Sequence, residues 1–404
     1  MKKFFQWIFL VIVFGILFSG CVKKASLPIW VSKISTLKSP IGPEEILRLP
    51  EGDPITFAQL SEEINQTRVV FVGESHDQIE HHQIQVRLVQ SLIAKGKNVV
   101  IAMEMFEGSQ QPILDRWSQG VLIEEEFLKQ VNWETTWGMD YELYKGILDE
   151  AKSHHLKVLA LNVQRNLVRR VAQHGIEKFS SEDRKQLPEM DLADQQHRTY
   201  LQSIYEGHQG GSAEGFKNFY QAQSLWDEGM AERLSQFLKS PDGEGKTVLV
   251  FAGSGHIAFG FGIPKRFYRR TPIPYQTIVL KVWKEKIDED FAFTETSSPL
   301  ANFLWITRPN PPEKKRPRIG VILTQQKEDQ KGLWIEKVIP DSPAEKAGLL
   351  SGDQLMAVEG KEIVKVKDIH NALEQKGWGN DIKLTITREG LKKEITVTLP
   401  PLEN

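Results

Sequence analysis

The sequence predicts an α/β domain, in which helices flank a mainly parallel sheet, followed by a small β-rich domain. Up to residue 295, short apolar runs alternate with helical patterns, which is typical of a parallel sheet covered on both faces. A Pro- and Lys-rich stretch follows, and beyond it the pattern changes to short strands of alternating polarity. A chain of 404 residues is long enough for both domains.

The strands of the first domain are predicted from apolar, β-branched runs. Four of these runs predict buried strands: Val69–Val72, Val99–Met103, Lys157–Leu161 and Thr247–Ala252. Thr277–Val282 is expected to be a last strand at the edge of the sheet.

Helical patterns lie between these strands. Gln83–Lys95 carries apolar residues at helical spacing, and a basic helix begins near Arg165 after the third strand. A long helical stretch is expected over residues 191–238, where aromatic residues recur every three or four positions. This stretch is interpreted as core.

The N-terminus has the pattern of an export signal. Two lysines precede an apolar run from Phe4 to Phe18, and two small residues lead into Cys21, the only cysteine. Residues 17–21 resemble a bacterial lipobox, so Cys21 is the predicted lipidation site; a plain transmembrane anchor is the alternative. The expected location is the cell envelope, at the outer membrane facing the periplasm in a Gram-negative source.

The predicted organisation follows from these patterns. It comprises a signal peptide (residues 1–20), a tether (21–50), the α/β domain (51–295), a Pro- and Lys-rich linker (296–317) and the β-rich domain (318–400). The net charge of −2 gives no reason to expect nucleic acid as a partner.

Three predicted strands end in side chains that suit acid/base or metal chemistry. His76 with Glu74, then Glu104, and finally His256 each follow a buried strand. Because the carboxyl ends of parallel strands lie at one edge of a sheet, these groups are expected to converge. His76, Glu104 and His256 form a ligand set suited to a divalent metal such as zinc. His81 and His82, at a helix start, are expected to be solvated.

Five segments then give a specific resemblance. They are G-E-S-H-D…H-H at 73–82, M-E-M-F at 103–106, A-L-N-V-Q-R at 160–165, F-Y-Q-A-Q-S-L-W-D-E-G-M-A at 219–231 and G-S-G-H-I-A-F-G-F-G-I-P-K-R at 253–266. Over about residues 50–290 the chain resembles the ChaN family of bacterial lipoproteins. Their superfamily, haem-binding uptake/Tiki, also contains TraB-like proteins and erythromycin esterases.

The resemblance implies two roles for the first domain. Glu74, His76, Glu104 and His256 match the superfamily's catalytic or metal-binding positions. The ChaN branch is associated with haem binding and iron acquisition through a tyrosinate ligand aided by a His, and its matching segment is residues 137–144. Tyr144 is the first choice for this ligand and Tyr141 the second. Arg165 and Arg169 are candidates to pair with haem propionates, and a haem-sharing homodimer is a further expectation by family analogy.

The second domain resembles a bacterial PDZ domain. The matching segments are R-I-G-V at 318–321, V-I-P-D-S-P-A-E-K-A-G-L at 338–349 and G-D-Q-L-M-A-V-E-G-K-E-I at 352–363. The backbone N–H groups of Ile319, Gly320 and Val321 are expected to bind a peptide or protein C-terminus, with Ile369 and Leu373 lining the side-chain pocket.

Two main functions remain open at this point, beside a third in which the first domain is an inert scaffold and only the PDZ–peptide contact is functional. One is a lipid-anchored haem-binding protein, active in iron acquisition or haem handling, whose PDZ domain recruits an envelope partner. The other is a metal-dependent hydrolase using His76, Glu104 and His256, with the PDZ domain delivering a peptide substrate. Whether the protein is an enzyme is not decided by the sequence.

Overall fold

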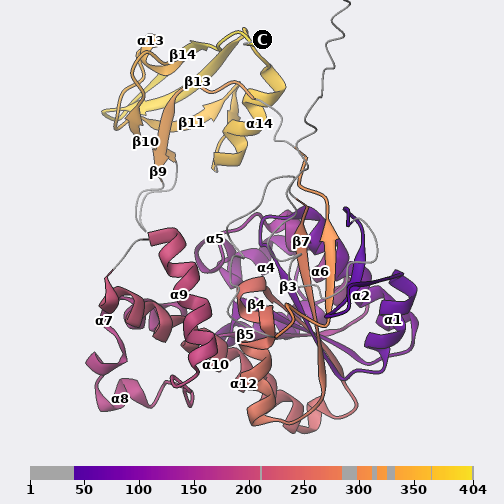
Figure 1. Cartoon of the computed structure of the whole chain (residues 1–404). Coiled ribbons are helices and arrows are strands. Elements are labelled where there is room, and N and C mark those ends of the chain that lie inside the picture. Colours follow the sequence, from indigo (N-terminus) through magenta and orange to yellow (C-terminus); the bar gives the residue numbers. More distant parts are fainter. Residues whose placement is uncertain are drawn as a thin grey trace, which may run out of the picture. The chain divides into compact units, whose positions relative to one another are not determined.

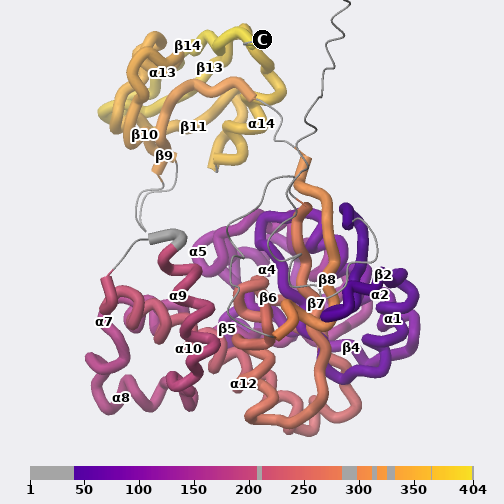
Figure 2. The backbone as a smooth tube through the Cα atoms, viewed as in Figure 1, coloured from indigo at the N-terminus to yellow at the C-terminus, as the bar shows by residue number. Residues whose placement is uncertain are grey.

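The computed structural model describes residues 41–209, 212–283, 298–311, 316–324, 333–364 and 366–402. The predicted signal peptide and Cys21 lie outside these residues. The chain divides into two compact units, Met1–Asn310 and Pro311–Asn404. Figures 1 and 2 show their elements, and each unit is described by itself. No helix within the described ranges is long and apolar enough to cross a membrane.

The first unit contains an eight-stranded sheet among its described residues, in the order β2-β1-β8-β7-β3-β6-β4-β5. The six strands from β8 to β5 run parallel, and β1 joins both β8 and β2 antiparallel. The predicted α/β fold with a mainly parallel sheet is confirmed. The strands are β1 (Ile46–Arg48), β2 (Asp53–Ile55), β3 (Val69–Glu74), β4 (Val99–Glu107), β5 (Lys157–Asn162), β6 (Thr247–Gly253), β7 (Tyr275–Val282) and β8 (Phe303–Thr307).

Helices cover both faces of this sheet, as Figure 1 shows. The strands are apolar on both sides: Val69 and Phe71 of β3 belong to one core cluster, and Val70 and Val72 to the other. The helices are α1 (Phe57–Asn65), α2 (Ile79–Ala94), α3 (Gln111–Ser118), α4 (Glu124–Val131), α5 (Trp133–Thr136), α6 (Tyr141–Ser153), α7 (Arg165–His174), α8 (Ser181–Arg184), α9 (Gln195–Gln209), α10 (Ala213–Lys239), α11 (Ser254–Ile257) and α12 (Ile263–Arg270).

The sheet extends further along the sequence than predicted. Strand β1 lies in the predicted tether, and β8 lies in the predicted linker. Because β8 pairs with β7, the predicted edge strand Thr277–Val282 lies inside the sheet instead. All five residues of β8 are buried, so this apolar segment completes the core before the Pro-rich stretch begins.

The second unit is a β-rich fold, as predicted. Its sheet has the order β14-β13-β11-β10-β9, and β12 pairs with β11. Ile319, Leu355 and Leu373 belong to its own apolar core. The elements are β9 (Val321–Thr324), β10 (Leu333–Val338), α13 (Pro343–Lys346), β11 (Gln354–Val358), β12 (Lys361–Glu362), α14 (Val366–Lys376), β13 (Asp381–Arg388) and β14 (Leu391–Thr398).

Candidate functional site

The ends of strands β3, β4 and β6 bring the predicted cluster together. Glu74 pairs in register with Gly253, and β6 lies between β3 and β4. One oxygen of Glu104 accepts the Gly253 backbone N–H at 2.7 Å. Its other oxygen lies 3.5 Å from His256 Nε2. The parallel sheet therefore places residues separated by about 150 positions in direct contact.

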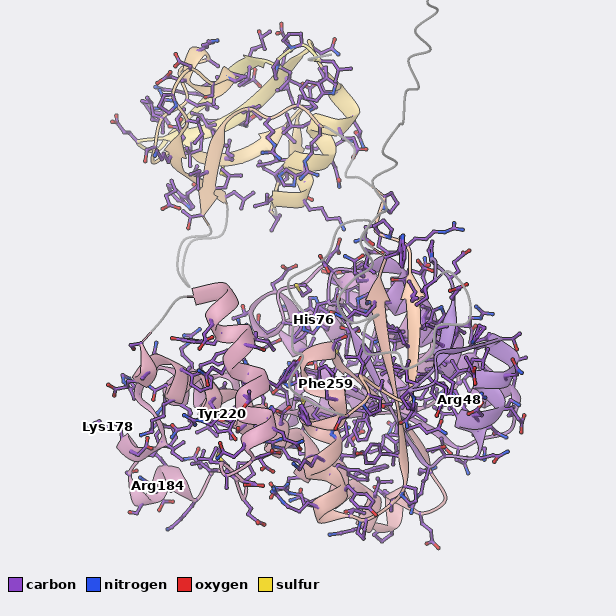
Figure 3. All side chains as sticks on the ribbon, in the orientation of Figure 1. Arg48, His76, Lys178, Arg184, Tyr220 and Phe259 are labelled. Atoms are coloured by element: carbon purple, nitrogen blue, oxygen red, sulfur yellow. The ribbon has the colours of Figure 1, made fainter. Side chains whose placement is uncertain are left out.

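His76 is the most exposed residue of the cluster. Its side chain is 32% exposed, and Figure 3 labels it where β3 ends. Nδ1 donates to Glu74 Oε1 at 2.8 Å, and no hydrogen bond joins Nε2 to another described residue. The ring lies over Gly253: a Cβ there would be 3.2 Å from Nε2. Burial lowers the pKa of His76, but the hydrogen bond to Glu74 and the charge of Glu104 raise it above the ordinary value.

A buried layer holds Glu74 behind His76. Glu74 is 2% exposed, accepts Gln85 Nε2 at 2.5 Å and the Tyr144 hydroxyl at 3.3 Å, and lies 3.3 Å from His82 Nδ1. Burial raises the pKa of Glu74, yet His76, His82 and Gln85 together bring it below the ordinary value. Glu74 is therefore a carboxylate that fixes the ring of His76.

His81 and His82 were expected to be solvated, and this is wrong. Both are buried, because the first turn of α2 packs against the end of β3. His81 Nδ1 accepts the Ser75 N–H at 2.9 Å, and its Nε2 lies 3.0 Å from Thr307 Oγ1. Burial lowers the pKa of His81 to about 3, so it is neutral. The Thr307 partner comes from β8, which the sequence did not predict.

His256 is held in the same way as His76, by a carboxylate on Nδ1. Asp227 of α10 lies 2.7 Å from this nitrogen and is 1% exposed. Burial opposes the charge of His256, but Glu104 and Asp227 outweigh it and raise its pKa to about 9. His256 is therefore an imidazolium at neutral pH, with its Nε2 facing Glu104.

Asp227 belongs to a buried charge network that sequence reasoning missed. Its second oxygen lies 3.3 Å from His197 Nε2, and Arg266 Nη2 lies 3.0 Å from His197 Nδ1. Arg266 in turn pairs with Glu228, whose carboxylate also binds the side chains of Arg269 and Arg270. The available signal was the acidic pair Asp227–Glu228 beside the apolar residues Leu225, Trp226 and Met230 of the helical stretch.

The cluster is thus two imidazoles on either side of one carboxylate. Each imidazole has its Nδ1 fixed by a buried acid. The Nε2 of His76 is therefore available for proton transfer or ligation, whereas the Nε2 of His256 faces Glu104. No group of three His, Cys, Asp or Glu residues is arranged to hold a metal ion in the described part of the chain. The predicted metal site at His76, Glu104 and His256 is not found, because Glu104 binds Gly253 and His256 directly.

The two candidate tyrosines lie behind the cluster, on α6. Tyr144 has no exposed surface, and its hydroxyl donates to Glu74 and to the His76 carbonyl, both at 3.3 Å. The Tyr141 hydroxyl is buried and has no hydrogen-bond partner among the described residues. Burial, followed by nearby acidic groups, raises the pKa of both tyrosines. Both hydroxyls are therefore protonated in this structure.

The two candidate arginines lie on the exposed side of α7. Arg165 donates from Nη1 to the carbonyls of Thr135 and Thr136, at 2.9 and 3.3 Å. The next residue, Trp137, contacts the ring of His76 edge-on at 4.8 Å between centroids. Arg165 is thus anchored to the residue that precedes Trp137, and Trp137 contacts His76. Arg169 is exposed, one helical turn further along.

In the second unit, the predicted peptide site is at a sheet edge. Strand β9, which begins at Val321, pairs with β10 on one side and is the last strand in the sheet order. Gly320 has a φ of +85°, and the carbonyls of Ile319 and Gly320 accept from Ala344 and Ile339. Ile369 and Leu373 are 2% and 3% exposed, so they belong to the core beneath α14.

Comparison with known proteins agrees with both folds. The family model "Haem-binding uptake, Tiki superfamily, ChaN" matches residues 60–267, and a PDZ domain model matches residues 317–399. This chain belongs to the ChaN haem-binding uptake family and carries a C-terminal PDZ domain. A solved structure, "Cofacial heme binding to ChaN of Campylobacter jejuni", has a TM-score of 0.51. It is 19% identical and covers 66% of this chain and 98% of that one, a likeness that shows the fold alone.

Curated relatives match at the level of the PDZ domain. A probable periplasmic serine protease do/HhoA-like of Haemophilus influenzae is 36% identical over 70 residues, which is 17% of this chain and 15% of that protein. The periplasmic pH-dependent serine endoprotease DegQ of Escherichia coli is 24% identical over 202 residues, or 48% of this chain and 37% of that protein. The chain spans well under half the length of these relatives.

Proposed function

We propose that the protein binds haem at the edge of the first unit and recruits a protein partner through its PDZ domain. Membership of a haem-binding family supports the first part. The main structural support is the geometry of His76. Its imidazole is partly exposed, Glu74 fixes its Nδ1, and its Nε2 is left for ligation. A carboxylate-oriented His is a common proximal ligand of haem iron. Bound haem would supply an iron centre for iron acquisition or haem handling.

The geometry favours His76 over the tyrosines as the axial ligand. Tyr144 has no exposed surface and Tyr141 is 8% exposed, whereas the side chain of His76 is 32% exposed. The Tyr144 hydroxyl also donates to the carboxylate that orients His76. Tyrosinate ligation, predicted from the resemblance, would require this hydroxyl to leave its buried site. We therefore assign Tyr144 a positioning role through Glu74.

The surroundings of His76 suit a porphyrin. Trp137 offers an aromatic surface beside the ring, and Ile79, which follows on α2, is 44% exposed. Arg165, anchored next to Trp137, provides a guanidinium for a propionate carboxylate. Arg169, one turn along the same exposed helix face, is the second candidate.

A haemin titration of the full chain tests this assignment. We expect a Soret shift that is lost in His76→Ala and retained in the Tyr144→Phe/Tyr141→Phe double variant. His154→Ala is the matched control, because His154 is an exposed histidine on the same unit. A shift that survives His76→Ala but not the double variant would refute ligation by His76 in favour of tyrosinate. Sedimentation with and without haemin shows whether two copies share the ligand.

The second part of the proposal concerns the PDZ domain. Strand β9 has an unoccupied edge in the described sheet, which can pair with an extended peptide C-terminus. We expect binding of C-terminal peptides from a display library, and loss of binding when the terminal carboxylate is amidated. Equal binding of the amidated peptides would contradict this recognition mode.

We also propose that the protein is exported and lipid-anchored at Cys21, on the pattern of residues 1–21. Cys21→Ser should move the protein from the membrane fraction to the soluble fraction of its host envelope. Membrane attachment that persists in Cys21→Ser would instead favour a transmembrane anchor.

A further inference from the structure

A pocket of about 320 Å³ lies at the ends of β4 and β5, against α10. Its walls are the turn at Gly108 after β4, the segment from Asn162 to Gln164 after β5, and the segment from Gly229 to Gln236 of α10. This volume falls within the range of small-molecule sites. The residues proposed to contact haem, which are His76, Ile79, Trp137 and Arg165, do not line this pocket.

Arg233 of α10 is the feature that suggests a ligand. The side chain is half-buried, and the described residues provide it with neither an ion pair nor a hydrogen bond. Burial lowers the pKa of Arg233, and the opposing charge comes from its chain neighbour Glu232, which also lines the pocket but forms no ion pair with Arg233 among the described contacts. By contrast, the buried Arg266 is paired with Glu228. A partly desolvated guanidinium without an ion pair or hydrogen bond is costly, which is why buried charges are usually paired.

Gly108 leaves room for the Arg233 guanidinium, and Gly229 lets the helix that carries Arg233 pack closely against Val163. A Cβ on Gly108 would lie 1.4 Å from Arg233 Nη2 and 1.8 Å from Cζ, so the guanidinium occupies the space of that missing side chain. A Cβ on Gly229 would lie 2.1 Å from Val163 Cγ1, so α10 approaches the end of β5 closely at this point. The guanidinium is thus held against the backbone at the wall of the pocket.

We propose that this pocket binds a small organic anion, a carboxylate or a phosphate monoester, through Arg233. The planar guanidinium can donate two parallel hydrogen bonds to either group. Gln164, Gln236 and Ser109 also line the pocket and can bond to hydroxyl groups of the same ligand. The site is independent of iron or haem.

Isothermal titration of the haem-free full chain tests the proposal, with inorganic phosphate and succinate as separate probes at constant ionic strength. We expect saturable binding of one or both, and the tighter probe identifies the anion class. Arg233→Gln should weaken binding about tenfold or more, because charge-assisted hydrogen bonds are lost. Gly108→Ala keeps the charge but displaces the guanidinium, so it should weaken binding similarly.

Arg116→Gln is the matched control, since Arg116 is an exposed arginine on α3. Its affinity should equal that of the unmodified chain, and thermal melting checks that every variant folds. If Arg233→Gln fails to fold, Arg233→Lys replaces it and should still weaken binding, because lysine lacks the planar fork. The proposal is overturned if neither probe saturates, if Arg116→Gln weakens binding equally, or if binding survives Arg233→Gln or Gly108→Ala.

Discussion

Asp227→Asn should lower the pKa of His256 and remove a pH-dependent part of the stability. His256 has a pKa of about 9 in the folded chain, against an ordinary value of 6.5, because Glu104 and Asp227 outweigh the cost of burial. Asn keeps the shape of Asp227 but removes its charge and its 2.7 Å acceptor for the imidazolium. Two of the three favourable influences on the His256 charge depend on Asp227.

The magnitude follows from proton linkage. A group whose pKa is higher in the folded state stabilises that state fully below its unfolded pKa and loses the effect as the pH rises through its folded pKa. For His256 this window is 6.5 to 9. At about 1.4 kcal/mol for each pKa unit, the contribution is about 3 kcal/mol at pH 6 and vanishes near pH 10. Asp227→Asn should lose most of this amount at pH 6 and little of it at pH 10.

Two measurements together test this reasoning. An NMR titration of the His256 ring should give a midpoint near 9 in the unmodified chain and a lower midpoint in Asp227→Asn. Urea unfolding at several pH values should show a smaller decline in stability between pH 6.5 and 9 for the variant. His154→Asn, at an exposed histidine, provides the control. A His256 midpoint near 6.5 in the unmodified chain, or an unchanged midpoint in Asp227→Asn, would refute the reasoning.

Three further substitutions have defined outcomes. Glu74→Gln should lower the free energy of unfolding by about 3 kcal/mol in urea titrations, because it removes a buried carboxylate bonded to His76 and Gln85. An unchanged unfolding midpoint would show that these bonds to Glu74 do not stabilise the fold. Gly253→Ala should weaken haemin binding with little loss of stability, since the new Cβ would lie 3.2 Å from His76 Nε2 and displace the His76 ring. An unaltered haemin affinity would argue against His76 as the iron ligand. Gly320→Ala should destabilise the second unit by about 2 kcal/mol or more, measured by calorimetry, because Gly320 has a φ of +85° and a Cβ there would clash with the side chain of Ser342. If the second unit of the variant still melts at the original temperature, this turn tolerates a side chain.

The sequence by itself determined the strands that carry the cluster. Val69–Glu74 and Thr247–Gly253 are buried on both faces, so they are continuous apolar runs that stand out from any helical pattern. Parallel strands end at one sheet edge, so the meeting of Glu104 with His256 followed from these runs. The short strand Phe303–Thr307 was missed because a Pro-rich stretch follows it directly and suggested a linker.

Only the tertiary structure decided which groups stand behind the cluster. Asp227 lies 29 positions from His256 on a long helix, and local periodicity does not reveal which residue a buried acid on that helix will meet. The same holds for Tyr144, a plausible iron ligand by sequence, whose hydroxyl folding buries against Glu74. The local sequence pattern specifies where a strand ends. The protonation and orientation of His76 and His256 depend on burial and on the distances between charged groups, and these exist only after the chain has packed.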